Sequence, residues 1–419
     1  MKVFINSPKI FSPESKWHLK TANVLIENGV IAYIGNEIKK ADTEVEGKGR
    51  WLSPGWFDTW AHFCDPGFEN KEDQFSGRKA AAAGGFTSVA VLPNTHPVIS
   101  TKNDIAYLKR ANDDHLTAVY PYAAVTTGNN GDDLTEMIDL FESGAIAFTD
   151  GESPIKDSET VVKVLQYLTK MDALLIQKPI DVSLAAGGTL HEGIKSTELG
   201  LKGIPALAEE LIIQRDLSLL KYAGGRLHFS TISTSGAVVK IKNAKKSGLD
   251  VTCSVSALQL LFSDLDIEDF DSNYKVMPPF RSERHNKAMI KGLNEGTIDV
   301  ICSAHIPQDT ESKKLEFDLA DFGVTGLQTV APALAKLSEW VPMEVLLEKV
   351  STSPRNLLGL DVPLIEVGEK AELTLFDPKM KWTFDAESNF SKSDNSPLFG
   401  KELVGKAVAV LRGNIYQQN

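Results

Sequence analysis

The sequence has 419 residues, of which 42% are hydrophobic and 24% charged, and its formal net charge is −12. This is the composition of an ordinary globular protein with enough apolar material for a large core, and the acidic balance argues against nucleic-acid binding. The chain has neither an apolar signal segment at its start nor a stretch of about 18 apolar residues. Its three cysteines, Cys64, Cys253 and Cys302, are far apart, as in proteins with reduced thiols. We therefore expect a cytoplasmic protein.

Both ends of the chain have the alternating pattern of short β-strands. Near the start, the Asn28-Gly29 pair between two such runs predicts a hairpin. Neither end could easily bury its apolar face alone, so we predict one small β-sandwich domain made of residues 1–52 and 364–419. Its expected strands are Lys2–Ile5, Asn23–Glu27, Val30–Ile34, Thr43–Glu46, Ala371–Phe376 and Val408–Leu411.

Between the two ends, short apolar runs alternate with amphipathic helical segments such as Ser158–Lys170 and Gly203–Tyr222. Eight such units over residues 53–363 predict the α/β class and a TIM-like (β/α)8 barrel. In a barrel of this kind, functional side chains lie at the carboxyl ends of the strands. The expected strands are Trp56–Trp60, Ser88–Leu92, Ala118–Ala123, Ala145–Asp150, Leu174–Gln177, Leu227–Thr231, Asp250–Ser254 and Asp299–Ser303.

Several motifs resemble those of a known family. The segment SPGWFDTWAHFCDPG, residues 53–67, resembles the first-strand motif P-G-x-x-D-x-H-x-H-x-R-x-P-G of type I dihydroorotases in the amidohydrolase superfamily. The likeness continues in the same order and spacing through Pro93-Asn94-Thr95, Pro278-Pro279-Phe280-Arg281, Phe322–Leu327 and Asn395-Ser396-Pro397.

The resemblance implies a two-metal hydrolase, in which a metal-bound hydroxide attacks a ring amide. His62 and Asp150 stand at family metal positions and are retained. Three other metal positions are substituted, by Trp60, Gln177 and Thr231, and Ala304 stands where the family has its catalytic aspartate. Because catalytic zinc normally takes three protein ligands, we expect no cofactor, and zinc only if some activity is retained.

The positions that bind substrate in the family have changed in parallel. Asn94 is retained, whereas Cys64 replaces an arginine and Met277 replaces an asparagine. A thiol and a thioether offer no charged partner to a substrate carboxylate.

The remaining candidates have simple structural interpretations. We expect Trp60 to fill the volume left by metals and substrate, and we consider that Lys178 pairs with Asp150 in place of the lost metal charge. His305 is interpreted as a packing or supporting histidine, and His228 as a structural one. The other histidines are expected at the surface: His18, His96, His115, His191 and His285.

The resemblance thus indicates a dihydroorotase-family protein of pyrimidine biosynthesis that is catalytically inactive. By analogy with inactive homologues, it would be a structural or regulatory subunit, for example with aspartate carbamoyltransferase. Because members of the family commonly dimerise, a homodimer is also expected. Two alternatives stay open. One is an active cyclic amidohydrolase with a single metal held by His62, Asp150 and His305, and the other is a metal-free module that binds a small ligand.

Overall fold

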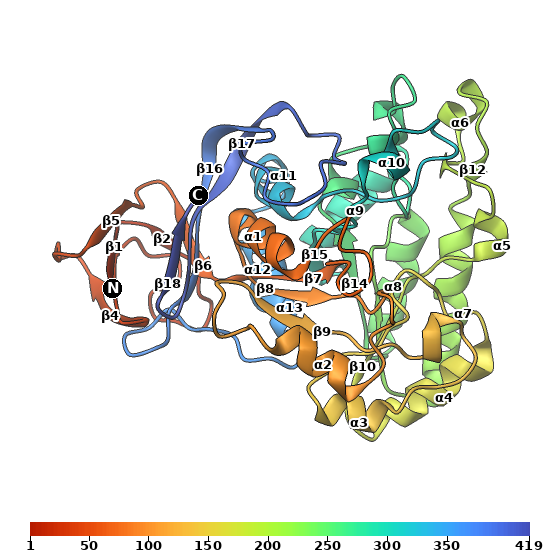
Figure 1. Ribbon diagram of the computed structural model, residues 1–419, viewed down its shortest axis with the longest axis horizontal. Coiled ribbons are helices and arrows are strands. Elements are labelled where there is room, and N and C mark those ends of the chain that lie inside the picture. The colour runs from red at the N-terminus through yellow and green to blue at the C-terminus, as the bar shows by residue number, and fades with distance from the viewer.

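The two ends of the chain form two sheets at one side of the molecule, as the computed structural model, which describes residues 1–419, shows (Figure 1). The first sheet has the order β4-β3-β1-β5, and the second has the order β18-β17-β16-β6-β2. The first contains β1 (Lys2–Asn6), β3 (Asn23–Glu27), β4 (Val30–Gly35) and β5 (Thr43–Glu46). The second contains β2 (Lys9–Ile10), β6 (Trp51–Pro54), β16 (Glu372–Phe384), β17 (Lys401–Arg412) and β18 (Ile415–Gln418).

These two sheets share one apolar core. Val3 and Val24 from the first sheet belong to the same buried cluster as Leu373 and Leu411 from the second. The hairpin expected at Asn28-Gly29 is confirmed, because β3 and β4 pair antiparallel across it. The domain boundaries at 52/53 and 363/364, and the name β-sandwich, stay predictions.

Parallel strands form the centre of the remaining chain. Three of them, β7 (Trp56–Ala61), β8 (Phe86–Val91) and β9 (Ala118–Pro121), pair in that order. Four others pair in the order β10-β13-β14-β15. They are β10 (Leu174–Gln177), β13 (Arg226–Phe229), β14 (Val251–Ser256) and β15 (Val300–Cys302).

Single bridges connect these two groups into a closed circuit, which we call the strand ring. Phe148 bridges to Ala123 beyond β9 and to Leu175 in β10, and Ala61 in β7 bridges to His305 beyond β15. The fourth expected strand, Ala145–Asp150, therefore takes part only through Phe148. The mixed α/β architecture is confirmed, and the circuit has the order that a (β/α)8 barrel requires.

Helices cover the outside of the strand ring (Figure 1). In α4 (Ser158–Thr169), the buried residues Val161, Val164, Leu165 and Leu168 follow the spacing of one helical face, and the Asp157 side chain caps the first turn. The other helices are α1 (Gln74–Gly84), α2 (Lys102–Lys109), α3 (Met137–Glu142), α5 (Val182–Ala185), α6 (Ile194–Glu198), α7 (Leu207–Ala223), α8 (Ser235–Lys246), α9 (Glu283–Asn294), α10 (Thr310–Lys313), α11 (Val330–Leu337), α12 (Met343–Val350) and α13 (Thr352–Leu357). None of the helices is both long and apolar enough to cross a membrane.

The helix expected from Gly203 begins later than the sequence suggested. Gly203 and Ile204 form the short strand β12, which pairs with β11 (Leu190–His191), and α7 starts at Leu207. This small sheet lies in the long connection after β10, beside the carboxyl ends of the ring strands.

Candidate functional site

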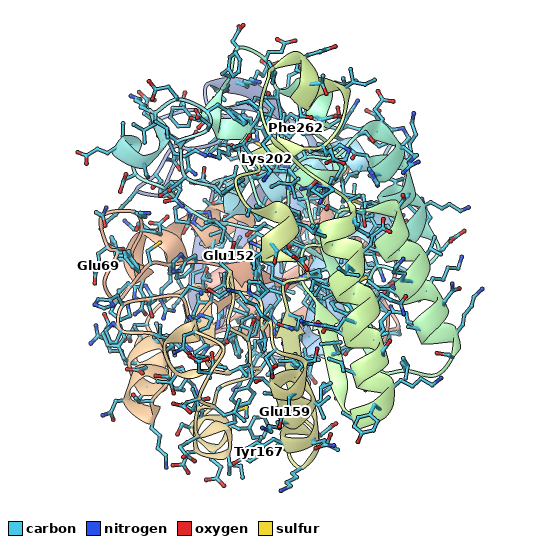
Figure 2. The ribbon with its side chains drawn as sticks, turned by 90° about the vertical axis from the view of Figure 1, so that its right-hand side faces the viewer. Glu69, Glu152, Glu159, Tyr167, Lys202 and Phe262 are labelled. Atoms are coloured by element: carbon cyan, nitrogen blue, oxygen red, sulfur yellow. The ribbon has the colours of Figure 1, made fainter.

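The positions that the sequence singled out gather at the carboxyl ends of the ring strands. Trp60 lies in β7 and Gln177 ends β10, while Thr231 and Ala304 lie two residues after the ends of β13 and β15. Figure 2 views the molecule from this side, with Glu152 near its centre. We call this end the mouth of the strand ring.

The Trp60 indole occupies the inside of the strand ring. Its side chain is buried in one cluster with Phe57, Tyr122 and Ile176, and its Nε1 donates to Glu152 Oε1 at 3.0 Å. The cavity left between Trp60, Met277 and Ala304 has a volume of only about 20 Å³. A second one, between Lys178, Thr231 and Met277, has about 10 Å³. Such volumes are close to that of one water molecule, so the mouth has no room for a substrate.

Asp150 is bound by backbone and hydroxyl groups of the protein itself. Its Oδ1 accepts hydrogen bonds from Val125 N at 2.8 Å and Thr126 N at 2.9 Å, and its Oδ2 accepts one from Thr126 Oγ1 at 2.6 Å. Burial raises the pKa of Asp150, and these hydrogen bonds oppose that shift. The carboxylate is thereby satisfied without a metal ion.

Lys178 does not pair with Asp150, so this expectation was wrong. The Lys178 ammonium is buried and forms its ion pair with Glu152, whose other oxygen accepts from Trp60. The reason is that hydrogen-bond donors from the loop after β9 already surround Asp150, whereas Glu152 has its second carboxylate oxygen available for Lys178.

Asn94 holds the turn that carries these carboxylates. Its Nδ2 donates to Asp150 O at 3.0 Å, and its Oδ1 accepts from Glu152 N at 3.0 Å. A side chain on Gly151 would place a Cβ only 1.7 Å from Asn94 Oδ1, and Gly151 has a left-handed φ of 59°. Asn94 is therefore engaged in backbone support.

His62 keeps a free ring nitrogen. Its Nε2 is buried without a hydrogen-bond partner, and its Nδ1 lies 3.5 Å from Cys64 Sγ. Burial lowers the pKa of His62 to about 4, so the ring is neutral at pH 7. Burial also raises the pKa of the Cys64 thiol, which stays protonated.

His305 has both ring nitrogens occupied, as expected of a packing histidine. Its Nδ1 accepts from Gly326 N at 3.2 Å, and its Nε2 lies 3.3 Å from Glu72 Oε2. Glu72 is fully buried and also accepts hydrogen bonds from Ser76 and Ser391. The segment around Ser391 comes from the connection between β16 and β17, so the second terminal sheet contributes to this end of the strand ring.

The substituted positions provide no metal ligand of the kind that the family uses. The Gln177 amide is bound to Ile155 N and to Asp216 Oδ2. Thr231 Oγ1 is buried without a partner, and Ala304 has only a methyl group. His228, expected to be structural, is buried between the hydroxyls of Thr252 and Ser254.

The residues present do not fit a two-metal centre. No group of three or more His, Cys, Asp or Glu side chains is arranged so that it could hold a metal ion. Of the three side chains that a single-metal site would need, Asp150 and His305 are already bound within the protein, and only His62 has a free nitrogen. Catalytic zinc normally requires three protein ligands.

Two histidines expected at the surface are buried, which is a correction. His191 is 7% exposed and accepts from Arg281 Nη1 at 3.2 Å, and His285 is 3% exposed and accepts from Ser235 N at 2.8 Å. His191 lies in β11 and His285 in α9, and their ring centroids are 5.5 Å apart. The two-residue strands β11 and β12 give little periodic signal in the sequence, so this contact was not predicted. Glu72 and Glu152 were also missed, since neither lies in a motif that the resemblance covers.

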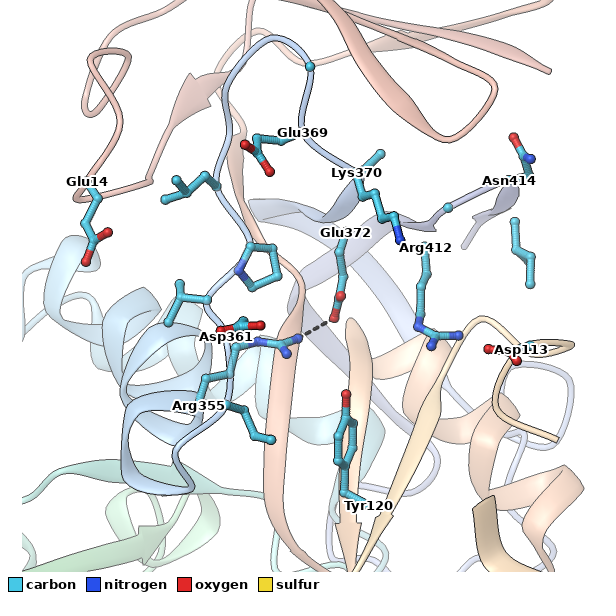
Figure 3. A pocket seen from close by; sticks show the side chains of 18 of the residues that line it. Glu14, Asp113, Tyr120, Arg355, Asp361, Glu369, Lys370, Glu372, Arg412 and Asn414 are labelled. Carbon is cyan, nitrogen blue, oxygen red and sulfur yellow. Dashed lines mark hydrogen bonds and ion pairs between the residues drawn. The ribbon is translucent and has the colours of Figure 1, made fainter. Parts of the chain in front are cut away.

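A large cleft lies at the opposite end of the strand ring (Figure 3). It is an open cleft of about 1300 Å³ next to the second terminal sheet. Arg355 is paired there with Glu372, which also accepts from Thr87 at the start of β8. Lys370 and Arg412 line the same cleft, together with carboxylates (Glu14, Asp113, Asp361 and Glu369). None of the candidate site residues lines it.

Comparisons with known proteins agree with the motifs. A family described as dihydro-orotase-like matches residues 49–237. The chain is 37% identical over 412 residues to a dihydroorotase of Geotalea daltonii, covering 97% of both chains. It is 38% identical over 416 residues to a dihydroorotase of Pelobacter propionicus, covering 98% of both.

Solved structures show the same fold at low sequence identity. The L-hydantoinase (dihydropyrimidinase) from Arthrobacter aurescens is similar with a TM-score of 0.85 and 23% identity, over 99% of this chain and 95% of that one. The dihydropyrimidinase from Brevibacillus agri gives a TM-score of 0.81 and 22% identity, with the same coverage. Because the curated relatives are 37% and 38% identical over nearly the whole chain, the chain belongs to the dihydroorotase family.

Proposed function

We propose that this chain is a member of the dihydroorotase family in pyrimidine biosynthesis that does not hydrolyse the ring amide. In this interpretation, the strand ring is the (β/α)8 barrel of the family, and the terminal sheets are its β-sandwich. The observation that carries the proposal is the Trp60 indole, which is buried inside the ring where a metal ligand is expected from the family motif. The side chains around it leave cavities of about one water molecule.

The chemistry of the mouth supports the same proposal. Hydrolysis of a cyclic amide needs an activated water and a group that accepts and returns its proton. The methyl group of Ala304 cannot transfer a proton, and the carboxylate of Asp150 is bound to three donors. With the substitutions at Trp60, Gln177 and Thr231, nothing at the mouth combines these roles.

As its role, we propose a structural or regulatory subunit that binds another protein. Aspartate carbamoyltransferase is the partner that the resemblance to inactive homologues suggests, and a homodimer is the expected state of the chain itself. The connections after β10, β14 and β15 lie at the closed mouth and would be free for such contacts.

The main alternative is an active cyclic amidohydrolase, as the names of the curated relatives suggest. It would use one metal ion on His62, Asp150 and His305, and the free Nε2 of His62 is the observation in its favour. It would require Asp150 to leave Val125 and Thr126, and His305 to leave Glu72. A module that binds a small ligand at the mouth would require Trp60 to move.

One sample of the purified full-length protein tests the proposal, with zinc content and dihydroorotate ring hydrolysis measured together. We expect zinc well below one ion per chain and hydrolysis at the background rate. Stoichiometric zinc that is lost in His62→Ala, together with turnover, would establish the active alternative. His18→Ala is the matched control, because His18 lies between β2 and β3 in the terminal sheets, away from the mouth. The partner is tested separately, by co-elution with aspartate carbamoyltransferase from the same cells; separate elution contradicts that partner.

A further inference from the structure

We propose that an acidic and apolar surface beside the mouth docks a basic face of another protein. This surface, which we call the mouth shelf, consists of residues 190–202, 264–274 and 311–321. The three segments follow β10, β14 and β15, so they all lie at the carboxyl ends of ring strands. The inference deepens the proposed function, on which it rests, by naming where a partner binds and what its chemistry is.

The mouth shelf is one packed unit, since its three segments share a small core. Leu190, Ile267 and Phe317, one from each segment, form a buried cluster of their own. Ser272 Oγ donates to Lys313 O at 2.5 Å, and Lys275 Nζ, next to the second segment, donates to Asp318 O at 2.9 Å. The segments therefore present their outer side chains on a common support.

Large apolar side chains are exposed in all three segments. They are Ile194, 76% exposed, Leu319, 63%, Leu265, 56%, Phe270, 48%, and Leu315, 46%. A group of exposed apolar residues on a folded surface is typical of a protein contact.

Backbone strain accompanies one of these side chains. Asp269 and Phe270 both have left-handed φ angles, 51° and 55°, and a bulky residue rarely adopts this conformation. Because an aromatic side chain held outward in such a conformation costs stability, it indicates a use outside the fold.

The negative charge of the mouth shelf indicates that its partner carries positive charge. Residues 264–271 and 311–321 contain nine carboxylates and two lysines, a formal charge of −7 out of −12 for the whole chain. One of the lysines, Lys313, is buried against backbone carbonyls. A single ion pair, Lys71 with Asp321 at 3.6 Å, neutralises part of this charge, and Asp264 Oδ1 is buried without a partner.

Such a surface repels a second copy of itself and any other anionic surface. It favours a partner that carries lysines or arginines around an apolar centre. The occupant that we infer is therefore a different protein with a basic, partly apolar face.

The test uses a fluorescent helical peptide that has leucines on one face and lysines on the other, titrated into the full-length protein at low salt. The expected result is saturable binding, weakened about tenfold by Phe270→Ser with Leu319→Ser. An equal loss is expected for Glu268→Lys with Glu316→Lys. Hydrogen exchange should slow on peptide binding in residues 264–274 and 311–321. A peptide with glutamates in place of lysines should not bind.

Matched controls separate a specific surface from general attraction to an acidic protein. Ile38→Ser with Tyr222→Ser removes side chains that are 83% and 79% exposed elsewhere, and Asp132→Lys with Glu142→Lys makes the same charge change on the α3 side. Both control variants should bind as the unmodified protein does. Equal weakening by the controls, or no binding at all, would overturn the inference.

Two further outcomes are informative. Sedimentation could show a dimer that the variant Phe270→Ser with Leu319→Ser abolishes. That result would identify a second copy of this chain as the occupant and overturn the inference of a different, basic protein. Ring hydrolysis measured on the same samples separates the two proposals. If the protein both hydrolyses the ring and binds the peptide, only the proposed function is contradicted. If it does neither, only the inference about the mouth shelf is contradicted.

Discussion

Three residues at the mouth keep a backbone conformation that their side chains do not explain. Cys64, Thr231 and Ala304 have left-handed φ angles of 61°, 48° and 49°. The motif comparison predicts a metal-binding, catalytic or substrate-binding role for each of these positions, and backbone strain of this kind is typical of functional sites. Hydrogen bonds next to Ala304 hold the chain in place, since Asp58 accepts from Ser303 N and Ser303 Oγ. Under the proposed function, the backbone conformation of the family site is kept at positions whose side chains have changed.

Relief of this strain should stabilise the protein. Ala304→Gly removes the clash of a Cβ with a left-handed backbone, and we expect it to raise the free energy of unfolding by about 0.5–1 kcal/mol. Ala186→Gly is the control, because Ala186 is exposed and has an ordinary φ of −53°. There the added freedom of the unfolded chain should lower stability by a similar amount. Urea denaturation measures the free energy of unfolding of both variants. If both are less stable than the unmodified protein, the backbone at Ala304 is not strained.

At the scale of elements, the strands that bury a continuous apolar run were predicted well. Leu174–Gln177 was predicted residue for residue, and β7 extends only one residue beyond the expected Trp56–Trp60. Ala145–Asp150 has the same pattern but forms only bridges, because Asp150 turns to accept hydrogen bonds from the loop after β9. The two-residue strands within residues 190–204 are too short to show the alternation of apolar and polar residues that predicts a strand.

The candidate site was predictable only where a motif named it. The spacing of motif residues placed Trp60, Gln177 and Ala304 at one end of the strand ring. Glu72 and Glu152 reach the mouth from turns after the ring strands, and no pattern in the sequence shows which partner a turn carboxylate will meet. The pairing of Lys178 with Glu152 therefore had to come from the structure.

This ion pair connects the turn after Asp150 to the end of β10, and its loss should loosen the mouth. Glu152→Gln leaves the buried Lys178 ammonium without its carboxylate, so we expect a cost of about 1–3 kcal/mol, reduced from the fully buried case because Glu152 is partly exposed. Lys178→Met keeps the apolar stem and should cost less.

A double-mutant cycle measures the pair directly. We expect the double variant to be at least about 1 kcal/mol more stable than the sum of the single changes suggests. The exposed pair Lys336–Glu339 is the control, and its coupling should stay below about 0.5 kcal/mol. Equal couplings in the two cycles would mean that the Lys178 pair is as solvated as a surface pair.

For the whole molecule, buried histidines make the stability sensitive to mild acid. Burial lowers the pKa of His62 and His285 to about 4, and of His191 and His228 to about 3. Each of the four stays neutral in the fold and takes up a proton on unfolding below its ordinary pKa of about 6.5. Their contribution to stability is therefore complete above pH 6.5 and is lost as the pH falls toward the folded values. Burial raises the pKa of Asp58 and Asp150, so their contribution to stability increases as the pH falls, opposite to that of the histidines.

The loss at pH 5 should be about 2 kcal/mol for each of the two that lie deepest in the protein, His62 and His228. His228 allows the cleanest test, because its ring nitrogens are hydrogen-bonded to the Thr252 and Ser254 hydroxyls, and Lys245 is the one charged group that adds to the lowering of its pKa. We expect His228→Gln to destabilise the protein at pH 7.5 and to lose about 2 kcal/mol less than the unmodified chain between pH 7.5 and pH 5. His96→Gln, at an exposed position, should give a curve parallel to that of the unmodified protein. If the His228→Gln curve is parallel as well, His228 titrates alike in the folded and unfolded chain, and the acid sensitivity of this fold must come from its carboxylates.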